Sequence, residues 1–360
     1  MKTSPGTLSG ILCIVAVVGA GIWHAHDPDM QRWPLSTFAS CRATTNPSSE
    51  FSVNHIDWSA DGRVLLSLSR GGLDAESHLA LYDTQQKTFW MPFDVTGDSV
   101  RSAALAPDGR HVLVGSSQGL LLWLTSASPE VPTLLVKLPG LEQFSATAIS
   151  TDGRLAAGAT NMGSIHVCDV ASRTSVALTA DRKSSFVDLR FSKDGNWLVS
   201  AQNDGRISVW EYPKGELLQE FAGCTGLSQV VEFLPDGKRV ISAGLDDTVR
   251  IWDIASGRES WRGEFGLFGV TTLAVSADGM TAAWGGYNRK IVVWDLQRGQ
   301  KKRDIATRVS AVFQLRFSPD GSSLAAAGSE GTIRLYDVIT GAEHEGIVID
   351  ASCRPLPDDS

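Results

Sequence analysis

The sequence predicts an all-β protein built from seven consecutive four-stranded units. Three observations support this fold class: an Asp-Gly pair recurs seven times, apolar residues alternate around each pair, and the spacing settles at 42 residues. Asp-Gly is a strong hairpin-turn signal because glycine tolerates the positive φ that tight turns require. A unit of this length that holds four ordinary strands leaves no room for a helix.

Each unit is expected to place its turns at fixed positions. The Asp-Gly pair joins the first strand to the second, and an aromatic residue or Cys followed by an acidic residue ends the third strand in five units. A second Gly then closes the turn into the fourth strand. The turn residues are Asp61, Asp108, Asp152, Asp194, Asp236, Asp278 and Asp320. The third strands of the five regular units end at Cys168, Trp210, Trp252, Trp294 and Tyr336.

Two units depart from this spacing. In the first, the third strand ends five residues late at Tyr82, so the loop before it is longer and runs from Arg70 to His78. In the second, Leu124 stands at the aromatic position and Trp123 stands beside it. Both changes are compatible with four strands.

The repeated signature resembles the WD40 repeat family. The resemblance is carried by SPDG at Ser318 to Gly321, by LPDG at Leu234 to Gly237, and by the strand ends IWD, VWD and LYD. It extends over about residues 51 to 350. It implies a seven-bladed β-propeller, in which four-stranded antiparallel blades surround a central channel.

One feature of the WD40 pattern is missing. Its repeats often carry a His that joins a hydrogen-bonded set with a Ser or Thr, an Asp and the Trp. Two units match the last three roles, with Ser200, Asp204 and Trp210 in one and Ser242, Asp246 and Trp252 in the next, but no His of this chain takes the first role. We therefore expect the blades to be held together mainly by apolar packing.

The chain divides into four expected parts. These are a signal anchor or signal peptide (1–25), a linker (26–50), the propeller (51–350) and a C-terminal tail (351–360). Residues 6–23 form an uncharged, mostly apolar run at the lower length limit of a spanning helix, and its centre also fits a cleavable signal peptide. The run extends past Ala20 to Trp23, which favours an uncleaved anchor.

This segment predicts membrane attachment through residues 6–23, with the propeller outside the cytoplasm or secreted. A propeller that faces the cytoplasm is the alternative. Cys41 and Cys353 flank the ring on either side and meet where it closes, so a disulfide between them is possible and would require an oxidising compartment. Two free thiols remain an equal alternative.

Composition and motifs exclude several functions. A net charge of -8 opposes a general nucleic-acid surface, which needs clustered cations. The chain has no paired-Cys zinc spacing, phosphate-binding glycine loop or EF-hand, so we expect no metal and no cofactor. Residues 115–119 fit the G-x-S-x-G pattern, but they fall in an expected strand-to-strand turn and not on the strand-to-helix elbow that serine hydrolases need.

Charged residues near the end of the first strands are expected to line the channel. Those of neighbouring blades have opposite signs, which predicts ion pairs between Arg190 and Glu232 and between Arg316 and Asp57. We interpret these pairs as structural, since a catalytic or metal-holding channel would show a surplus of one sign.

The candidate partner-binding residues lie in loops on one face of the ring. Phe265, Leu267 and Phe268 are bulky residues among glycines, and Tyr287 lies in the next turn. They form either a contact surface or a cover over the blade edge, and the sequence does not separate the two. The long loop with Arg70 and Asp74 is a second candidate. The favoured function is a non-catalytic protein-interaction scaffold, with a propeller-based enzyme of the lactonase or dehydrogenase type as the alternative.

Overall fold

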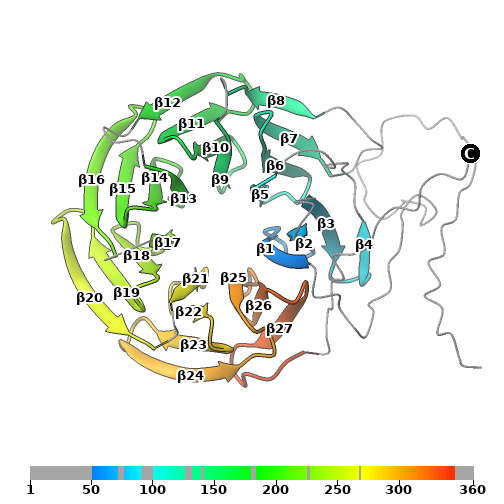
Figure 1. Cartoon of the computed structure of the whole chain (residues 1–360), viewed down its shortest axis with the longest axis vertical. Coiled ribbons are helices and arrows are strands. Elements are labelled where there is room, and N and C mark those ends of the chain that lie inside the picture. The colour runs from blue at the N-terminus through cyan, green and yellow to red at the C-terminus, as the bar shows by residue number, and fades with distance from the viewer. Residues whose placement is uncertain are drawn as a thin grey trace, which may run out of the picture.

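The computed structural model describes residues 51–71, 77–90, 100–125, 132–138, 142–179, 184–224, 228–266 and 269–344. They form seven β-sheets arranged in a closed ring, which confirms the predicted seven-bladed propeller (Figure 1). The expected N-terminal segment, the linker, the C-terminal tail, Cys41 and Cys353 lie outside these residues. Within them, no helix is long and apolar enough to cross a membrane.

The first three blades each contain four strands. Blade 1 consists of β1 (Phe51–Trp58), β2 (Val64–Gly71), β3 (Ser77–Asp83) and β4 (Thr88–Trp90). Blade 2 consists of β5 (Ser102–Leu105), β6 (His111–Gly115), β7 (Leu120–Leu124) and β8 (Thr133–Val136). Blade 3 consists of β9 (Phe144–Ile149), β10 (Leu155–Thr160), β11 (Ser164–Asp169) and β12 (Ser175–Thr179).

Blades 4, 5 and 6 also contain four strands each, and three strands of blade 7 lie within the described residues. Blade 4 consists of β13 (Phe186–Phe191), β14 (Trp197–Gln202), β15 (Arg206–Glu211) and β16 (Glu216–Ala222). Blade 5 consists of β17 (Ser228–Phe233), β18 (Arg239–Gly244), β19 (Thr248–Asp253) and β20 (Arg258–Glu264). Blade 6 consists of β21 (Val270–Val275), β22 (Thr281–Gly286), β23 (Lys290–Asp295) and β24 (Gln300–Ala306). Blade 7 contains β25 (Val312–Phe317), β26 (Ser323–Gly328) and β27 (Ile333–Asp337), followed by an antiparallel bridge between Tyr336 and Glu343.

Every sheet is an antiparallel meander, and its first strand is the innermost (Figure 1). Because successive strands reverse direction, the turns alternate between the two faces of the ring. The loops between blades and the turns between second and third strands share one face, which we call the interaction face. The Asp-Gly turns and the turns between third and fourth strands share the opposite face.

The predicted Asp-Gly turns are present in all seven blades. Their glycines have φ between 65° and 72°, a region that favours glycine. In five blades a Ser two residues before the Asp donates a hydrogen bond to its carboxylate, as Ser192 does to Asp194 at 2.6 Å. The same Ser hydroxyl accepts the backbone N–H three residues after the Asp, so one side chain fixes both ends of the turn.

The hydrophobic core is divided into seven clusters, one at each junction between blades. This arrangement corrects one sequence assignment in blade 2. Trp123 pairs with Val112 and is buried, whereas Leu124 is 42% exposed, so Trp123 and not Leu124 holds the aromatic position. Because side chains alternate along a strand, a shift of one residue exchanges the buried face for the exposed one.

Side chains of the innermost strands also tie each blade to the next. Oδ2 of Asp188 in blade 4 accepts the N–H of Val231 at 3.1 Å, and Oε2 of Glu232 in blade 5 accepts that of Val275 at 2.9 Å. Further bonds of this kind join Asp57 to Leu105, Ser102 to Thr147, Ser145 to Phe186 and Thr272 to Leu315. In blade 7 the equivalent side chain is Gln314, whose buried Oε1 has no hydrogen-bond partner. This type of bond therefore joins blades 1 to 7 in sequence, and Gln314 does not extend it to blade 1.

Candidate functional site

The interaction face carries a contiguous apolar patch over blades 5, 6 and 7. Leu245 and Tyr287 occupy the turns between second and third strands of blades 5 and 6 and are 39% and 49% exposed. Gly269 lies between them, since a Cβ on this residue would be 2.8 Å from Leu245 Cδ2 and 3.7 Å from the Tyr287 ring. The ring of Phe313 stands edge-on to Tyr287, with centroids 6.4 Å apart. We call Leu245, Gly269, Tyr287 and Phe313 the apolar patch.

The fold directs Phe313 toward this patch through a β-bulge. Val312 and Gln314 pair with consecutive residues of β26, so Phe313 between them has no partner in the ladder. A bulged residue bends its strand and changes the direction of its side chain, and such bulges recur next to functional sites. The first strands of blades 1, 3, 4, 5 and 6 have a register shift at the equivalent position.

The loop between blades 5 and 6 is fixed at both ends of the patch. Oδ1 of Asp247 accepts the N–H of Gly269 at 2.6 Å, and Nδ2 of Asn288 donates to the carbonyl of Gly266 at 3.2 Å. Asp247 holds φ at 62°, a left-handed conformation that costs most residues energy and that Asp adopts more readily. Equivalent turns in blades 4 and 7 use Gly205 and Gly331. In blade 5 the carboxylate of Asp247 holds the neighbouring loop, which a glycine there would not do.

Phe265 is packed against the blade and does not project freely from the loop. Its ring centroid lies 4.7 Å from that of Trp284 and 5.7 Å from that of Trp294, and Trp261 completes the aromatic cluster. The side chain is partly buried in the junction between blades 5 and 6. Of the two placements that the sequence left open, the structure shows Phe265 covering the blade edge.

The other candidate residues are only partly described. Tyr287 is exposed in the apolar patch, while Leu267 and Phe268 lie outside the described residues. Arg70 lies near the end of β2, paired with Ser77 in the adjacent strand, and Asp74 falls in the undescribed loop that follows. The structure therefore brings Tyr287 together with Leu245 and Phe313, two residues that sequence reasoning did not select. Repeat spacing contained the signal, because Leu245 and Tyr287 stand 42 residues apart.

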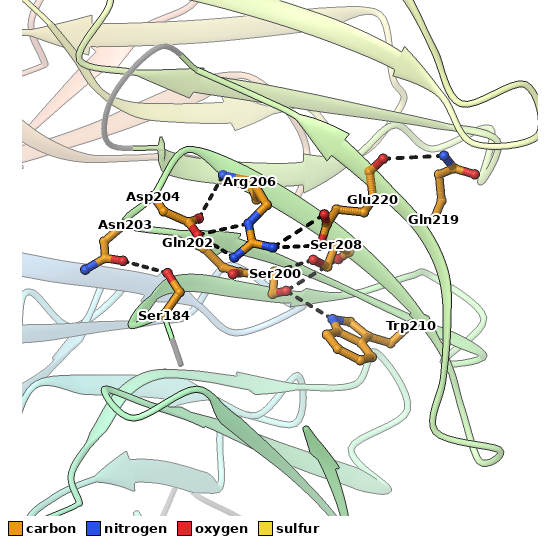
Figure 2. Close-up of polar contacts among 10 residues, drawn as sticks. All are labelled: Ser184, Ser200, Gln202, Asn203, Asp204, Arg206, Ser208, Trp210, Gln219 and Glu220. Carbon is orange, nitrogen blue, oxygen red and sulfur yellow. Dashed lines mark hydrogen bonds and ion pairs between the residues drawn. The ribbon is translucent and has the colours of Figure 1, made fainter. Parts of the chain in front are cut away.

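Polar side chains in blades 4 and 5 form hydrogen bonds and ion pairs without the His that WD40 repeats often carry. In blade 4, Nε1 of Trp210 donates to Ser200 at 3.1 Å, and Ser184 in the interblade loop donates to Asn203 at 2.7 Å (Figure 2). Arg206 joins Asp204 on the same edge, at 2.5 Å. Hydrogen bonds of these side chains therefore add to the apolar packing between the blades.

In blade 5 a buried arginine pairs with the Asp of the turn between the second and third strands. Nε1 of Trp252 donates to Ser242 at 2.9 Å. Nη2 of Arg250, two residues before the Trp, forms an ion pair with Asp246 at 2.8 Å, and both side chains are more than nine-tenths buried. Arg250 thus pairs with the turn Asp, the residue that the His contacts in the WD40 pattern. Its side chain reaches this position from the third strand and not from the interblade loop.

The channel contains a cluster of charges from blades 1, 4, 5 and 7. Arg190 Nη1 lies 3.1 Å from Asp188 Oδ1, and Arg190 Nε lies 4.0 Å from Glu232 Oε1. The predicted pairing of Arg190 with Glu232 is thus present. Arg316 Nη1 lies 3.6 Å from the same Glu232 oxygen, so the predicted pairing of Arg316 with Asp57 is wrong. Asp57 instead accepts backbone N–H groups of Trp58 and Leu105.

Burial in this cluster moves the protonation equilibria. It raises the pKa of Asp57 and of Glu232 above the usual value, because the charged form is poorly solvated and the two arginines compensate only in part. Burial and then the charges of Arg316 and Arg190 hold the pKa of His55 well below its usual value. Burial and repulsion by Arg190 lower the pKa of Arg316. For Arg190 burial is outweighed by the carboxylates around it, so its pKa is raised.

The G-x-S-x-G sequence and Cys168 occupy positions within the β-sheets and their turns. Ser116 of the G-x-S-x-G sequence lies in the turn after β6, where its hydroxyl accepts the N–H of Gln118 at 3.1 Å. No group of three or more His, Cys, Asp or Glu residues suited to a metal ion occurs in the part of the chain with assigned positions. Cys168 is a buried free thiol at the strand position that Trp holds in other blades.

Comparison with known families agrees with this architecture. The family model described as "WD domain, G-beta repeat" matches residues 174–211, 215–253 and 304–337. The first match covers β12 with the three inner strands of blade 4, and the second covers β16 with those of blade 5. No curated protein matched the chain.

The protein is a seven-bladed β-propeller. Three segments of it match the WD40 family model, which confirms the resemblance predicted from the sequence. WD40 propellers commonly serve as protein-interaction scaffolds and are typically non-catalytic.

Proposed function

We propose that this protein is a non-catalytic protein-interaction scaffold that binds its partner through the apolar patch. One observation carries the proposal: Leu245 and Tyr287 lie on either side of Gly269, and the ring of Phe313 stands against that of Tyr287. Clustered aromatic and aliphatic side chains of this kind supply most of the free energy at protein interfaces. The rigid anchoring of the neighbouring loop by Asp247 reduces the entropy lost on binding.

Further residues of the same loop extend this proposal. Leu267 and Phe268 stand between the fixed Gly266 and Gly269 in the sequence and remain candidate contacts. Arg70 and Asp74 of the long blade 1 loop remain candidates for a separate contact. Since Phe265 is held in the aromatic cluster, its expected role is to support the loop and not to touch the partner.

A capture experiment tests the patch. The full chain, Tyr287→Ala and Met280→Ala are used as baits, and recovered proteins are quantified by mass spectrometry. Met280 is the matched control because it is 45% exposed but follows an Asp-Gly turn on the opposite face. A partner bound through the patch is recovered equally with Met280→Ala and about tenfold less with Tyr287→Ala, as expected for loss of an interface anchor. Equal recovery with both variants would reject the apolar patch as the site.

We also propose that the propeller is tethered to or exported across a membrane by residues 6–23. The length and apolarity of this segment support the proposal. A disulfide between Cys41 and Cys353 belongs to the same proposal, because it forms only in an oxidising compartment. Mass mapping of native protein under non-reducing conditions tests it: a linked peptide supports export, and free thiols at both positions count against the bridge.

A further inference from the structure

In blades 1 to 6, the outer strand has one edge that no other described strand covers. Such an edge presents unpaired backbone N–H and C=O groups and can template the addition of another strand. Proteins protect these edges by shortening the strand, by introducing a β-bulge or by adding charged side chains. The outer strands can therefore be compared by the protection that each one has.

All but one of the six outer strands from blades 1 to 6 have at least one form of protection. β4 contains only three residues. β8, β16, β20 and β24 each have a register shift against the third strand. The last three also carry charged residues: Glu216 and Glu220 in β16; Arg258, Glu259, Arg262 and Glu264 in β20; and Lys301, Lys302, Arg303 and Asp304 in β24.

β12 has none of these features. It contains five residues, Ser175 to Thr179, with no charged side chain. Its pairing with β11 runs without a register shift. Val176 is 38% exposed and Ala177 is exposed, so no large or charged side chain screens the backbone at the centre of the strand. Among the described outer strands of blades 1 to 6, β12 is thus the flat and unprotected edge.

The hydrogen-bond pattern shows which backbone groups face outward. The N–H of Asp169 donates to the carbonyl of Thr174 at 2.9 Å, so Thr174 bonds inward to β11. Inward and outward residues alternate in an antiparallel strand. Ser175, Ala177 and Thr179 therefore direct their N–H and C=O groups outward. Three donors and three acceptors stand on this edge.

We propose that β12 pairs antiparallel with β12 of a second copy of the chain. A strand that pairs with this edge must itself have a flat and uncharged edge, and β12 of a second copy has such an edge. The edge is self-complementary under a twofold axis, which places Ala177 opposite Ala177 and Ser175 opposite Thr179. β12 lies on the outer circumference of the ring, where a second disc can approach it (Figure 1).

The resulting dimer is expected to be weak and dependent on concentration. Five residues form a short pairing, and each hydrogen bond contributes little net free energy once its competition with water is counted. Each copy carries a net charge of -8, so the two rings repel one another. Salt screens this repulsion, and association should therefore strengthen as ionic strength rises.

Sedimentation equilibrium of the full chain tests the proposal, in a density-matched detergent that keeps residues 6–23 in solution. Ala177→Lys places two like charges opposite each other and is expected to weaken self-association about tenfold; Ala177→Glu should do the same. An equimolar mixture of the two variants places opposite charges together and should restore the dimer. Gln219→Lys, on the protected β16, is the matched control and should associate as the wild type does.

Three results would overturn the inference. A wild-type chain that stays monomeric at high concentration excludes the second copy and leaves the edge to an extended segment of another protein. A dimer that persists in both Ala177 variants is held elsewhere, for example through residues 6–23. A mixture of the two charged variants that stays monomeric excludes the register with Ala177 opposite itself.

Discussion

The two arginines of the channel cluster are expected to differ in their contribution to stability. Both lie in the same environment, with side chains 18% (Arg190) and 12% (Arg316) exposed. They differ in their carboxylate partners. Arg190 has Asp188 at 3.1 Å and Glu232 at 4.0 Å, whereas among the described carboxylates Arg316 has Glu232 alone within 4.0 Å, at 3.6 Å, and Asp57 and Asp188 act on it from farther away.

Coulomb's law gives the size of the difference. With an effective dielectric constant of about 20, the attraction is about 5 kcal/mol from Asp188 and about 4 kcal/mol from Glu232 for Arg190, against about 4.5 kcal/mol for Arg316. Removing either guanidinium from water costs several kcal/mol. The repulsion between the two arginines disappears equally in either variant. Arg190 is therefore clearly favourable, and Arg316 nearly balances its own desolvation.

We expect Arg190→Met to lower the free energy of unfolding by about 3 kcal/mol, because Asp188 stays buried without its partner. We expect Arg316→Met to change it by less than about 1 kcal/mol. Urea unfolding at neutral pH, followed by fluorescence of the 11 tryptophans, measures both. Equal losses in the two variants, or a larger loss for Arg316→Met, would refute this treatment of the cluster.

Three further outcomes are expected. The folded protein holds the pKa of His55 below its usual value, so the free energy of unfolding should decrease as the pH falls below about 6.5. Urea midpoints between about pH 7.5 and 5.5 should decline less in His55→Gln than in the wild type. Gly328→Ala should destabilise by more than about 2 kcal/mol, since its Cβ would lie 1.8 Å from the carbonyl oxygen of Ala311; a thermal midpoint within about 2 °C of wild type contradicts this. Ser200→Ala removes the acceptor for Trp210 Nε1 and should cost about 1 to 3 kcal/mol, and an unchanged urea midpoint would show that the indole has another partner.

The ring was predictable from the sequence because the turn signals that define each blade are local and recur in every repeat. Each Asp-Gly turn needs only the Gly that tolerates positive φ and the Asp that accepts the following N–H, and seven copies in phase set the number of blades. The assignment of Leu124 instead of Trp123 to the aromatic position was wrong because this unit departs from the repeat. The turn before the third strand is one residue shorter in blade 2, and counting from the Asp-Gly pair does not reveal that change.

The cross-channel and surface contacts were less accessible to sequence reasoning. Arg316 was expected to pair with the neighbouring blade, but it reaches Glu232 two blades away because Ala274 of blade 6 has no long side chain to occupy the intervening space. Phe265 was ambiguous because its burial depends on Trp284, which takes the place where blades 4 and 5 have Ser200 and Ser242. Such effects arise from side-chain volumes in blades that are distant in sequence.

The unpaired Oε1 of Gln314 marks a seam in the ring. At the six junctions from blade 1 to blade 7 a side chain of an innermost strand bonds to the next blade. Among the described residues, the junction of blades 7 and 1 has no such bond and is packed by the cluster around Val53, Ile56 and Ile333, with the attraction between Arg316 and Asp57 beside it. This is also where the two ends of the propeller meet. When the ring is heated or pulled, separation should begin there and then release the other blades from both free ends, so the seam sets the lifetime of the closed ring.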